Sequence, residues 1–156
     1  MNLLFFMTLK QDVVFVYEDW TVRQALEKME KYRYSTVPVL ARDGRYVGTL
    51  TEGDLLWGIR RIRKEKNLEV EEMPLSGIPR RRDYEAVPAA TTGMEQLLAA
   101  ATNQNFVPVV DGRNNFIGLV RRNAILQYFY DRGWSEGSKQ NRSALFSQEN
   151  RTGSRA

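Results

Sequence analysis

Two stretches of the chain share one layout, and this repeat decides the fold. Residues 36–51 read TVPVLARDGRYVGTLT, and residues 106–121 read FVPVVDGRNNFIGLVR. Each stretch has an apolar run with a central proline, then an Asp-Gly turn, then a second apolar run that contains a glycine. Two apolar runs on either side of an Asp-Gly turn predict a β-hairpin. The chain is therefore predicted to be a tandem repeat with one hairpin in each copy.

The residues on either side of the first hairpin complete the first copy. A short strand is expected at residues 13–17, and it leads to Thr21-x-x-Gln24, which has the spacing of a helix capping box. The helix that follows has an apolar face of five residues, Val22, Ala25, Leu26, Met29 and Tyr32. After the hairpin a second helix is expected, with Leu55, Leu56, Ile59 and Ile62 on its apolar stripe. The first copy is thus predicted to be β-α-β-β-α.

The second copy follows the same plan. Its first strand is expected at residues 84–87, and Thr92-x-x-Glu95 takes the place of the first capping box. A final amphipathic helix is expected after residue 121. The fold class is therefore α+β, built from two β-α-β-β-α repeats.

Composition changes mark the expected boundaries of the repeats. Residues 1–67 form the first repeat, and residues 68–131 form the second repeat with the linker that precedes it. Residues 132–156 are rich in Gly, Ser, Asn and Arg, and we expect a largely disordered polar tail there.

The composition excludes several classes of function. The 156 residues include no cysteine and no histidine, which removes disulfides, thiol nucleophiles and the usual zinc ligands. The chain has no glycine-rich phosphate loop and no nucleophile with a plausible base, so we expect no enzymatic activity and no catalytic cofactor. The apolar run at residues 3–7 is too short to span a membrane, so a cytoplasmic location without membrane contact is expected.

The end of the first hairpin has two possible interpretations. Residues 48–56 read GTLTEGDLL, in which Thr51 and Asp54 stand three positions apart at the start of a helix. This spacing fits a helix cap, because a short hydroxyl and an acid can satisfy free backbone N–H groups. The same two side chains can also bind hydroxyl groups of a ligand. The two interpretations are compatible.

The repeat as a whole resembles a CBS-domain pair, also called a Bateman module. The likeness covers about residues 3–130 and rests on the Val-Pro-Val strand in each copy and on Gly48-x-x-Thr51-x-x-Asp54. The resemblance implies that the two repeats pack through their sheets about a pseudo-twofold axis and leave two related clefts. In such modules the clefts bind ligands that contain adenosine.

The resemblance also implies roles for individual residues of the first copy. Two would bind the ribose hydroxyls, three would line the adenine pocket, and one would lie near the phosphate path. In that order they are Thr51 and Asp54, then Val14, Val37 and Pro38, and finally Ser35. An alternative for the Val-Pro-Val element is an edge strand without ligand contact.

The second copy departs from the first at this site. Its counterpart of GTLTEGDLL is GLVRRNAIL, residues 118–126, in which Arg121 replaces Thr51 and Ala124 replaces Asp54. Some family members that bind a cyclic dinucleotide have a similar basic pair here. Arg121 and Arg122 are therefore candidate phosphate contacts. The alternative is that both are solvated at a helix start.

Two further basic clusters lie in the linker between the repeats and in the helix that follows the first hairpin. Residues 80–82 are three consecutive arginines, which either contact a phosphate or belong to a solvated linker. Residues 60–66 carry five basic side chains among apolar ones, a pattern typical of a solvated helix face.

The leading hypothesis is a non-catalytic sensor that binds AMP, ADP or ATP between the repeats and signals to a regulated partner protein. Alternative ligands are cyclic di-AMP and a diadenosine polyphosphate. Another alternative is a nucleic-acid-binding regulator that uses the arginine clusters, although the basic runs contain no recognition-helix motif. A homodimer is also expected, because several apolar side chains on the last helix of each copy exceed what one small core needs. They are Trp57, Tyr128, Phe129 and Tyr130.

Overall fold

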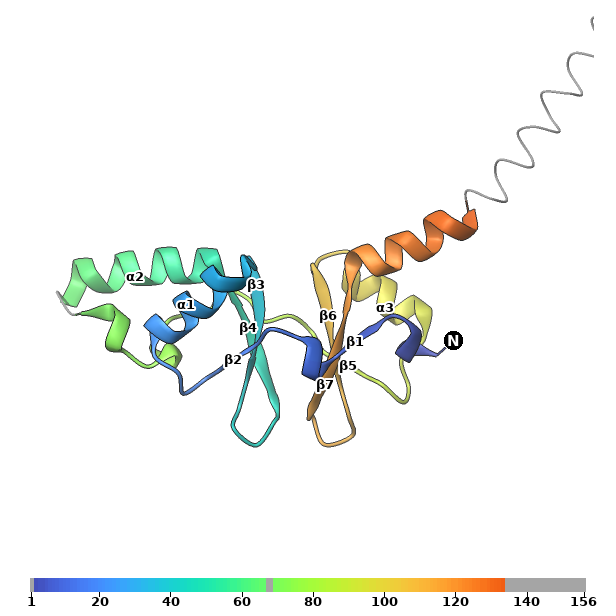
Figure 1. The fold of residues 1–156 in the computed structure, drawn as a ribbon, viewed down its shortest axis with the longest axis horizontal. Helices are drawn as coiled ribbons and strands as arrows, with labels where there is room; N and C mark the ends of the chain where they lie inside the picture. The colour runs from blue at the N-terminus through green and yellow to red at the C-terminus, as the bar shows by residue number, and fades with distance from the viewer. Residues whose placement is uncertain (1, 67–68, 134–156) are drawn as a thin grey trace, which may run out of the picture. The chain divides into compact units, whose positions relative to one another are not determined.

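The computed structural model describes residues 2–66 and 69–133 and confirms the α+β class (Figure 1). Residues up to 122 belong to one compact unit, and the described residues 123–133 belong to a second. The strands are β1 (Met7–Leu9), β2 (Val16–Tyr17), β3 (Thr36–Leu40), β4 (Tyr46–Thr51), β5 (Val87–Pro88), β6 (Phe106–Val110) and β7 (Phe116–Arg121). The helices are α1 (Val22–Tyr32), α2 (Glu52–Lys66), α3 (Met94–Ala101) and a last helix at 122–133.

Two sheets contain these strands, and they confirm the predicted repeat. The first has the order β2-β3-β4, and the second has the order β1-β7-β6-β5. In each copy the first strand is parallel to the middle strand, and the hairpin strands are antiparallel. The hairpin registers correspond, because Val39 faces Gly48 and Val109 faces Gly118. The second sheet therefore repeats the first and adds one strand.

The added strand, β1, comes from the start of the first copy and was not predicted. It pairs antiparallel with β7, so that Met7 faces Val120 and Leu9 faces Gly118. A three-residue strand has too short a pattern to be recognised in a sequence, and its partner lies more than 100 residues away. Only the packing of the chain shows that this segment belongs to the second sheet.

The first strand of each copy is shorter than expected. The strand predicted at residues 13–17 is confined to Val16–Tyr17, and that predicted at 84–87 is Val87–Pro88. Each pairs with only two residues of the middle strand, because the preceding residues leave the sheet.

The helix caps were predicted correctly in one copy only. Thr21 caps α1, because its hydroxyl accepts from the Gln24 N–H at 3.2 Å while the Gln24 amide oxygen accepts from the Thr21 N–H at 2.9 Å. The Thr92 cap is wrong. The Thr92 hydroxyl donates to the Pro88 carbonyl at 2.6 Å, and α3 begins one residue later, after Gly93.

The Val-Pro-Val strands lie inside their sheets, so the edge-strand alternative is wrong. Strand β3 lies between β2 and β4, and β6 lies between β5 and β7. An interior strand forms hydrogen bonds with a neighbour on each side, and proline has no N–H to donate to either. Pro38 is tolerated because β2 pairs only with Val39 and Leu40, so Pro38 lies beyond the end of β2.

A mainly apolar core lies between the first sheet and its helices. It combines one face of α1 and α2 with the inner face of β3 and β4 and with the linker turns after α2. Its fully buried members include Val16, Val22, Ala25, Val37, Val39 and Leu50. The linker turns at Val70–Glu72 and Leu75–Gly77 close this core with Val70 and Leu75. The predicted apolar faces of α1 and α2 are buried only in part. Val22, Ala25, Met29, Leu55 and Ile62 are buried and Leu26 and Ile59 are partly buried, whereas Tyr32 and Leu56 are exposed.

Corresponding residues of the two hairpins bind one another. The Tyr46 N–H donates to the Asn114 carbonyl at 3.1 Å, and the Phe116 N–H donates to the Gly44 carbonyl at 2.9 Å. The rings of Tyr46 and Phe116 stack with centroids 6.3 Å apart. Tyr46 corresponds to Phe116 in the repeat, and Gly44 corresponds to Asn114. The two hydrogen bonds are therefore equivalent, as a pseudo-twofold relation requires.

The second unit is described only over residues 123–133, which are helical. The predicted polar tail at 132–156 therefore lies almost wholly outside the described residues. Among the helices of residues 2–66 and 69–133, none is both long and apolar enough to cross a membrane.

Candidate functional site

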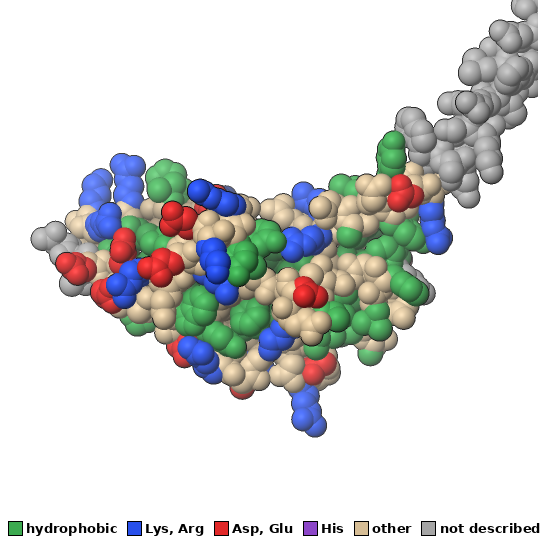
Figure 2. Space-filling view, viewed as in Figure 1, with side chains coloured by type: hydrophobic (Ala, Val, Ile, Leu, Met, Phe, Trp, Pro, Cys, Tyr) green, Lys and Arg blue, Asp and Glu red, His purple; other side chains and the backbone are tan. Residues whose placement is uncertain are grey.

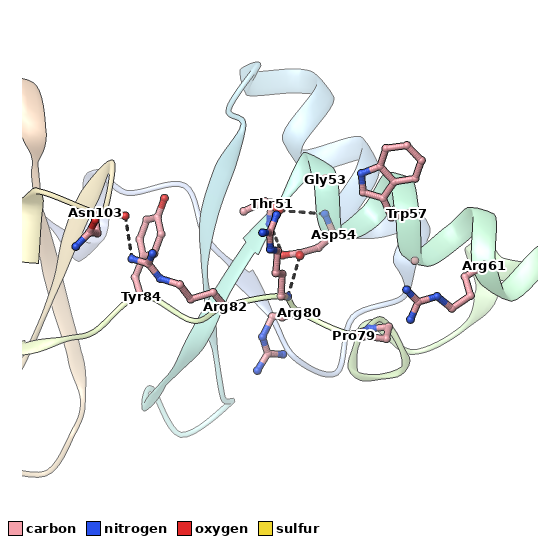
Figure 3. A pocket seen from close by; sticks show the side chains of 12 residues that line it. Thr51, Gly53, Asp54, Trp57, Arg61, Pro79, Arg80, Arg82, Tyr84 and Asn103 are labelled. Atoms are coloured by element: carbon pink, nitrogen blue, oxygen red, sulfur yellow. Dashed lines mark hydrogen bonds between the residues drawn. The ribbon is translucent and has the colours of Figure 1, made fainter.

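A cavity of about 750 Å³ lies at the start of α2, beside the linker that leads into the second copy (Figure 3). The first copy contributes the end of β4 and one stripe of α2, namely Thr51, Gly53, Asp54, Trp57, Gly58 and Arg61. The linker contributes residues 79–82, and the second copy contributes Tyr84 and Asn103. Both copies of the repeat and the segment between them therefore form its wall.

Thr51 and Asp54 form the predicted capping box. The Asp54 N–H donates to the Thr51 hydroxyl at 3.0 Å, and the Thr51 N–H donates to Asp54 Oδ2 at 3.0 Å. The pair satisfies backbone groups that the first turn of a helix leaves without partners. The cap interpretation is thus confirmed, and the binding interpretation stays compatible with it.

The carboxylate of Asp54 also holds the linker. Its Oδ1 accepts from the backbone N–H of Arg81 at 3.0 Å, and the residue is only 7% exposed. A carboxylate has about four acceptor positions. Two are occupied by backbone N–H groups, so two remain for hydroxyl groups of a ligand.

Two buried or partly buried side chains of β4 fix the rest of the linker. The Thr49 hydroxyl, which is fully buried, accepts from the Tyr84 N–H at 3.0 Å and donates to the Arg82 carbonyl at 3.3 Å. The Tyr46 hydroxyl donates to the Tyr84 carbonyl at 2.7 Å, and burial raises the pKa of this phenol. The backbone that carries the arginines is therefore rigidly placed.

Arg80 is paired with Asp83. Its Nε and Nη2 donate to the two carboxylate oxygens at 2.8 and 3.3 Å, and the hydrogen bond raises the pKa of Arg80. Burial opposes ionisation of Asp83. The hydrogen bonds from Arg80 and from the Thr49 N–H outweigh it, so the pKa of Asp83 is lowered. Both groups are charged at neutral pH.

The remaining arginines of the cavity differ in their contacts. Arg82 donates to the Asn103 carbonyl at 2.8 Å and lies over the Tyr84 ring, 5.7 Å from its centroid. The guanidinium groups of Arg61 and Arg81 have no ion pair or hydrogen bond to any described residue. These two cations are therefore available to an anion.

The electrostatics of the cavity favour an anionic ligand. Four arginines and one carboxylate line it, and the first turn of α2, which is the positive end of the helix dipole, forms part of its wall. Basic side chains also project from the surface over α2 (Figure 2). The linker arginines, for which the sequence left a phosphate role and a solvated linker open, lie at the cavity.

The four other first-copy residues assigned to the ligand do not line this cavity. Val37 and Pro38 are buried within β3, and Val14 packs against the core beneath α1. Ser35 is exposed, and its carbonyl accepts from the Glu52 N–H at 2.9 Å. Their ligand roles stay predictions.

The basic pair of the second copy does not line the cavity either. Arg122 Nε donates to the carbonyls of Ala101 and Gln104 at 2.8 and 2.9 Å, which caps the end of α3. The Arg121 guanidinium lies 5.5 Å from the centroid of the Tyr34 ring. A positive charge at a helix C-terminus is stabilising, so Arg122 already has a structural role.

Seven lining residues were not assigned to a ligand from the sequence, namely Gly53, Trp57, Gly58, Arg61, Pro79, Tyr84 and Asn103. Arg61 belongs to the basic cluster that was expected to be a solvated helix face. Trp57 stands three residues after Asp54, so helical spacing alone could have placed it on the same stripe. Tyr84 and Asn103 come from the second copy, and no local pattern indicates that they approach α2. Among the described residues, no group of three or more acidic side chains is placed to hold a metal ion.

Comparison with known sequences identifies part of the first copy. Residues 7–61 match the family model of the CBS domain. An uncharacterized protein of Methanocaldococcus jannaschii, MJ1426, is 26% identical over 146 residues, which cover 76% of this chain and 86% of the relative.

Comparison with solved structures extends the likeness to both copies. The CbpB protein of Listeria monocytogenes, solved in complex with c-di-AMP, has a TM-score of 0.72 and 22% identity. The match covers 84% of this chain and 96% of that one. CBSX2, solved in complex with AMP, has a TM-score of 0.63 and 22% identity over 81% of this chain and 93% of that one. At this level of identity the likeness shows the fold alone.

Proposed function

We propose that this chain, which is a CBS-domain-pair protein, is a non-catalytic regulatory module that binds an adenosine nucleotide in the cavity at the start of α2. One observation carries the proposal. The Thr51–Asp54 box, with two acceptor positions of the carboxylate still free, opens on a cavity lined by four arginines. A vicinal diol suits the carboxylate, and phosphates suit the guanidinium groups.

The number of arginines favours a ligand with several phosphate charges. Arg80 is already paired with Asp83, but Arg61 and Arg81 have no anionic partner among the described residues. Charge-assisted contacts of this kind are stronger than neutral hydrogen bonds. We therefore place ATP and ADP above AMP in affinity, and AMP above adenosine.

Known structures of this fold support a nucleotide and leave its type open. The Listeria protein was solved in complex with c-di-AMP, and CBSX2 was solved in complex with AMP. Cyclic di-AMP and diadenosine polyphosphates are therefore the alternative ligands of the same cavity. Binding would shift the equilibrium between two conformations only through different affinities for them.

The test is titration calorimetry with ATP, AMP and adenosine on the wild type and on Arg81→Ala. This variant removes the guanidinium but keeps the backbone N–H that binds Asp54. We expect a loss of about 1.5–3 kcal/mol for ATP and little change for adenosine. Arg63→Ala, an exposed α2 arginine outside the cavity, is the matched control. The proposal fails if the wild type binds none of the three compounds.

Arg121 and Arg122 belong in the same titration. From the sequence, this pair and the linker arginines were both candidates for phosphate contacts, and of the two clusters only the linker arginines line the cavity. If Arg121→Ala weakens ATP binding and Arg81→Ala does not, the phosphates lie on the second copy and this placement of the ligand is wrong.

The assembly and the signalling role are further parts of the proposal. We propose a homodimer that acts on a partner protein in the cytoplasm. A second groove of about 500 Å³ between α1 and α2 supports the dimer, because its walls are mostly apolar. Its apolar lining residues are Leu26, Met29, Leu55, Leu56 and Ile59. Leu56 is 59% exposed in the single chain.

A further inference from the structure

One of the four arginines of the cavity is bound to a carboxylate that does not itself line the cavity. Arg80 lines it, and the Arg80 Nε and Nη2 donate to the two oxygens of Asp83 at 2.8 and 3.3 Å. The side chain of Arg80 is 23% exposed and that of Asp83 is 42% exposed. An ion pair that is partly open to solvent contributes little net energy, so another anion can replace one of its members.

The Arg80 guanidinium is also within electrostatic range of Asp54. The hydrogen bond to Asp83 raises the pKa of Arg80, burial opposes this, and the negative charge of Asp54 adds to the increase. Asp54 is the carboxylate to which we assign the ribose. A nucleotide whose ribose binds Asp54 therefore brings its phosphates into the neighbourhood of Arg80.

Asp83 has a second contact, which attaches the linker to the first sheet. Its Oδ1 accepts from the Thr49 N–H at 3.0 Å, and Thr49 belongs to β4, the last strand in the order β2-β3-β4. A Cβ on Gly48 would meet the Asp83 carboxylate, so this carboxylate lies directly against the strand. One side chain thus holds both the outer edge of β4 and an arginine of the cavity.

We propose that Arg80 exchanges its partner when a nucleotide binds, leaving the Asp83 carboxylate for a phosphate. The inference rests on the proposed function and concerns the regulation of that site. Carboxylate and phosphate oxygens both accept two parallel hydrogen bonds from one guanidinium, so either anion can occupy Arg80. Asp83 is then an internal competitor that lowers the affinity for phosphates. Its release leaves a carboxylate without its cation against β4, which couples ligand binding to the contact between the linker and the first sheet.

The experiment is titration calorimetry with ATP and adenosine on the wild type, Asp83→Asn, Arg80→Ala and the double variant. The Oδ1 of an asparagine can still accept from the Thr49 N–H, but the amide carries no charge to hold Arg80. We expect Asp83→Asn to bind ATP about 2- to 5-fold more tightly, which is the factor that a partly exposed ion pair is worth, and to bind adenosine as the wild type does. In the Arg80→Ala background the same substitution should bring no gain. Glu85→Gln, which changes an exposed acid outside the cavity, is the matched control.

A measurement on the wild type tests the exchange without the Asp83 variant. In NMR spectra of the arginine side chains, the Nε–H signal of Arg80 is assigned by its absence in Arg80→Ala. This signal should move when ATP is added and should stay in place with adenosine, because only ATP supplies a phosphate.

Each contrary result has a distinct meaning. Unchanged or weaker ATP binding by Asp83→Asn overturns the exchange and leaves Asp83 as a structural contact, while nucleotide binding by the wild type stands. An equal gain in the Arg80→Ala background also overturns it, because the effect of Asp83 is then a general effect of its charge on the cavity. A wild type that binds ATP with no movement of the Arg80 signal overturns it as well. Absence of any ATP binding by the wild type overturns the proposed function itself.

Discussion

At the scale of single residues, Asp54 joins three parts of the chain through one carboxylate. It caps α2 by accepting from the Thr51 N–H, and it holds the linker by accepting from the Arg81 N–H. The residue is almost fully buried, so each of these N–H groups would lose its partner without gaining water if the carboxylate were removed. A side chain that serves the fold in this way also positions the arginines of the cavity.

Asp54→Asn should therefore affect both stability and binding. The amide has a single acceptor oxygen and cannot accept from two N–H groups on opposite sides, whereas the carboxylate can. We expect a loss of about 1–3 kcal/mol in the free energy of unfolding, measured by urea denaturation. ATP affinity should fall by about 1.5–3 kcal/mol in calorimetry of the folded variant. Glu52→Gln, an exposed acid of the same helix turn, is the control.

The two readouts separate the roles of Asp54. If stability falls and ATP affinity is unchanged, Asp54 is a cap and a linker contact, and its assignment to the ribose is wrong. If neither changes, the hydrogen bonds of the Asp54 carboxylate contribute nothing to the free energy of unfolding or to ATP binding.

At the scale of elements, the linker occupies on the first sheet the place that β1 occupies on the second. A Cβ on Gly118 would meet the Thr8 carbonyl of β1, and a Cβ on Gly48 would meet the Asp83 carboxylate of the linker. The two glycines correspond in the repeat. Each lets an extra segment approach the outer hairpin strand, but a backbone lies against one and a side chain against the other.

This difference predicts unequal costs for two matched substitutions. Gly118→Ala forces the backbone of β1 away, and we expect a loss of about 1–3 kcal/mol or more in the free energy of unfolding. In Gly48→Ala the side chain of Asp83 can rotate away, so the loss should be smaller. A larger loss of stability in Gly48→Ala than in Gly118→Ala would contradict this account.

At the scale of the molecule, the two copies share a second, aromatic core. It contains Tyr46 and Phe116 from the hairpins and Tyr84 from the start of the second copy. Tyr84 also lines the cavity, and Tyr46 binds its backbone carbonyl, so residues of the contact between the two repeats also hold the wall of the site. A ligand that contacts both the first repeat and the linker would thus be coupled to the packing of the two repeats against each other.

The proposed homodimer is tested at this scale. We expect sedimentation velocity at micromolar concentration to show the mass of two chains. Leu56→Glu should shift it to one chain, because a charge in the apolar groove between α1 and α2 opposes its burial. Trp57→Ala, on the adjacent stripe that lines the cavity, should leave the mass unchanged. A wild-type mass of one chain, with and without ATP, would contradict the dimer.

Much of the architecture could be predicted from the sequence because it depends on neighbours along the chain. Turn chemistry at Asp43-Gly44 predicted the first hairpin, and Gly44 has a positive φ of 94°. In the second hairpin the residue with positive φ is Asn114, at 64°, and not the Gly112 of the predicted Asp-Gly turn. The spacing of Thr51 and Asp54 predicted the cap of α2, and it is present. These patterns act over two to four residues, where sterics and hydrogen bonding leave few alternatives.

Contacts between distant segments of the chain were decided only by the tertiary structure. Arg121 and Arg122 were candidate phosphate contacts from the sequence, but Arg122 caps α3 and neither lines the cavity. The linker arginines line it because buried Thr49 and Asp54 bind the backbone of the linker. By itself the sequence determined the repeat, its elements and the asymmetry between its copies. Packing determined which basic cluster meets the Thr51–Asp54 box, because the direction of a side chain depends on how its backbone is held by residues far away in the chain.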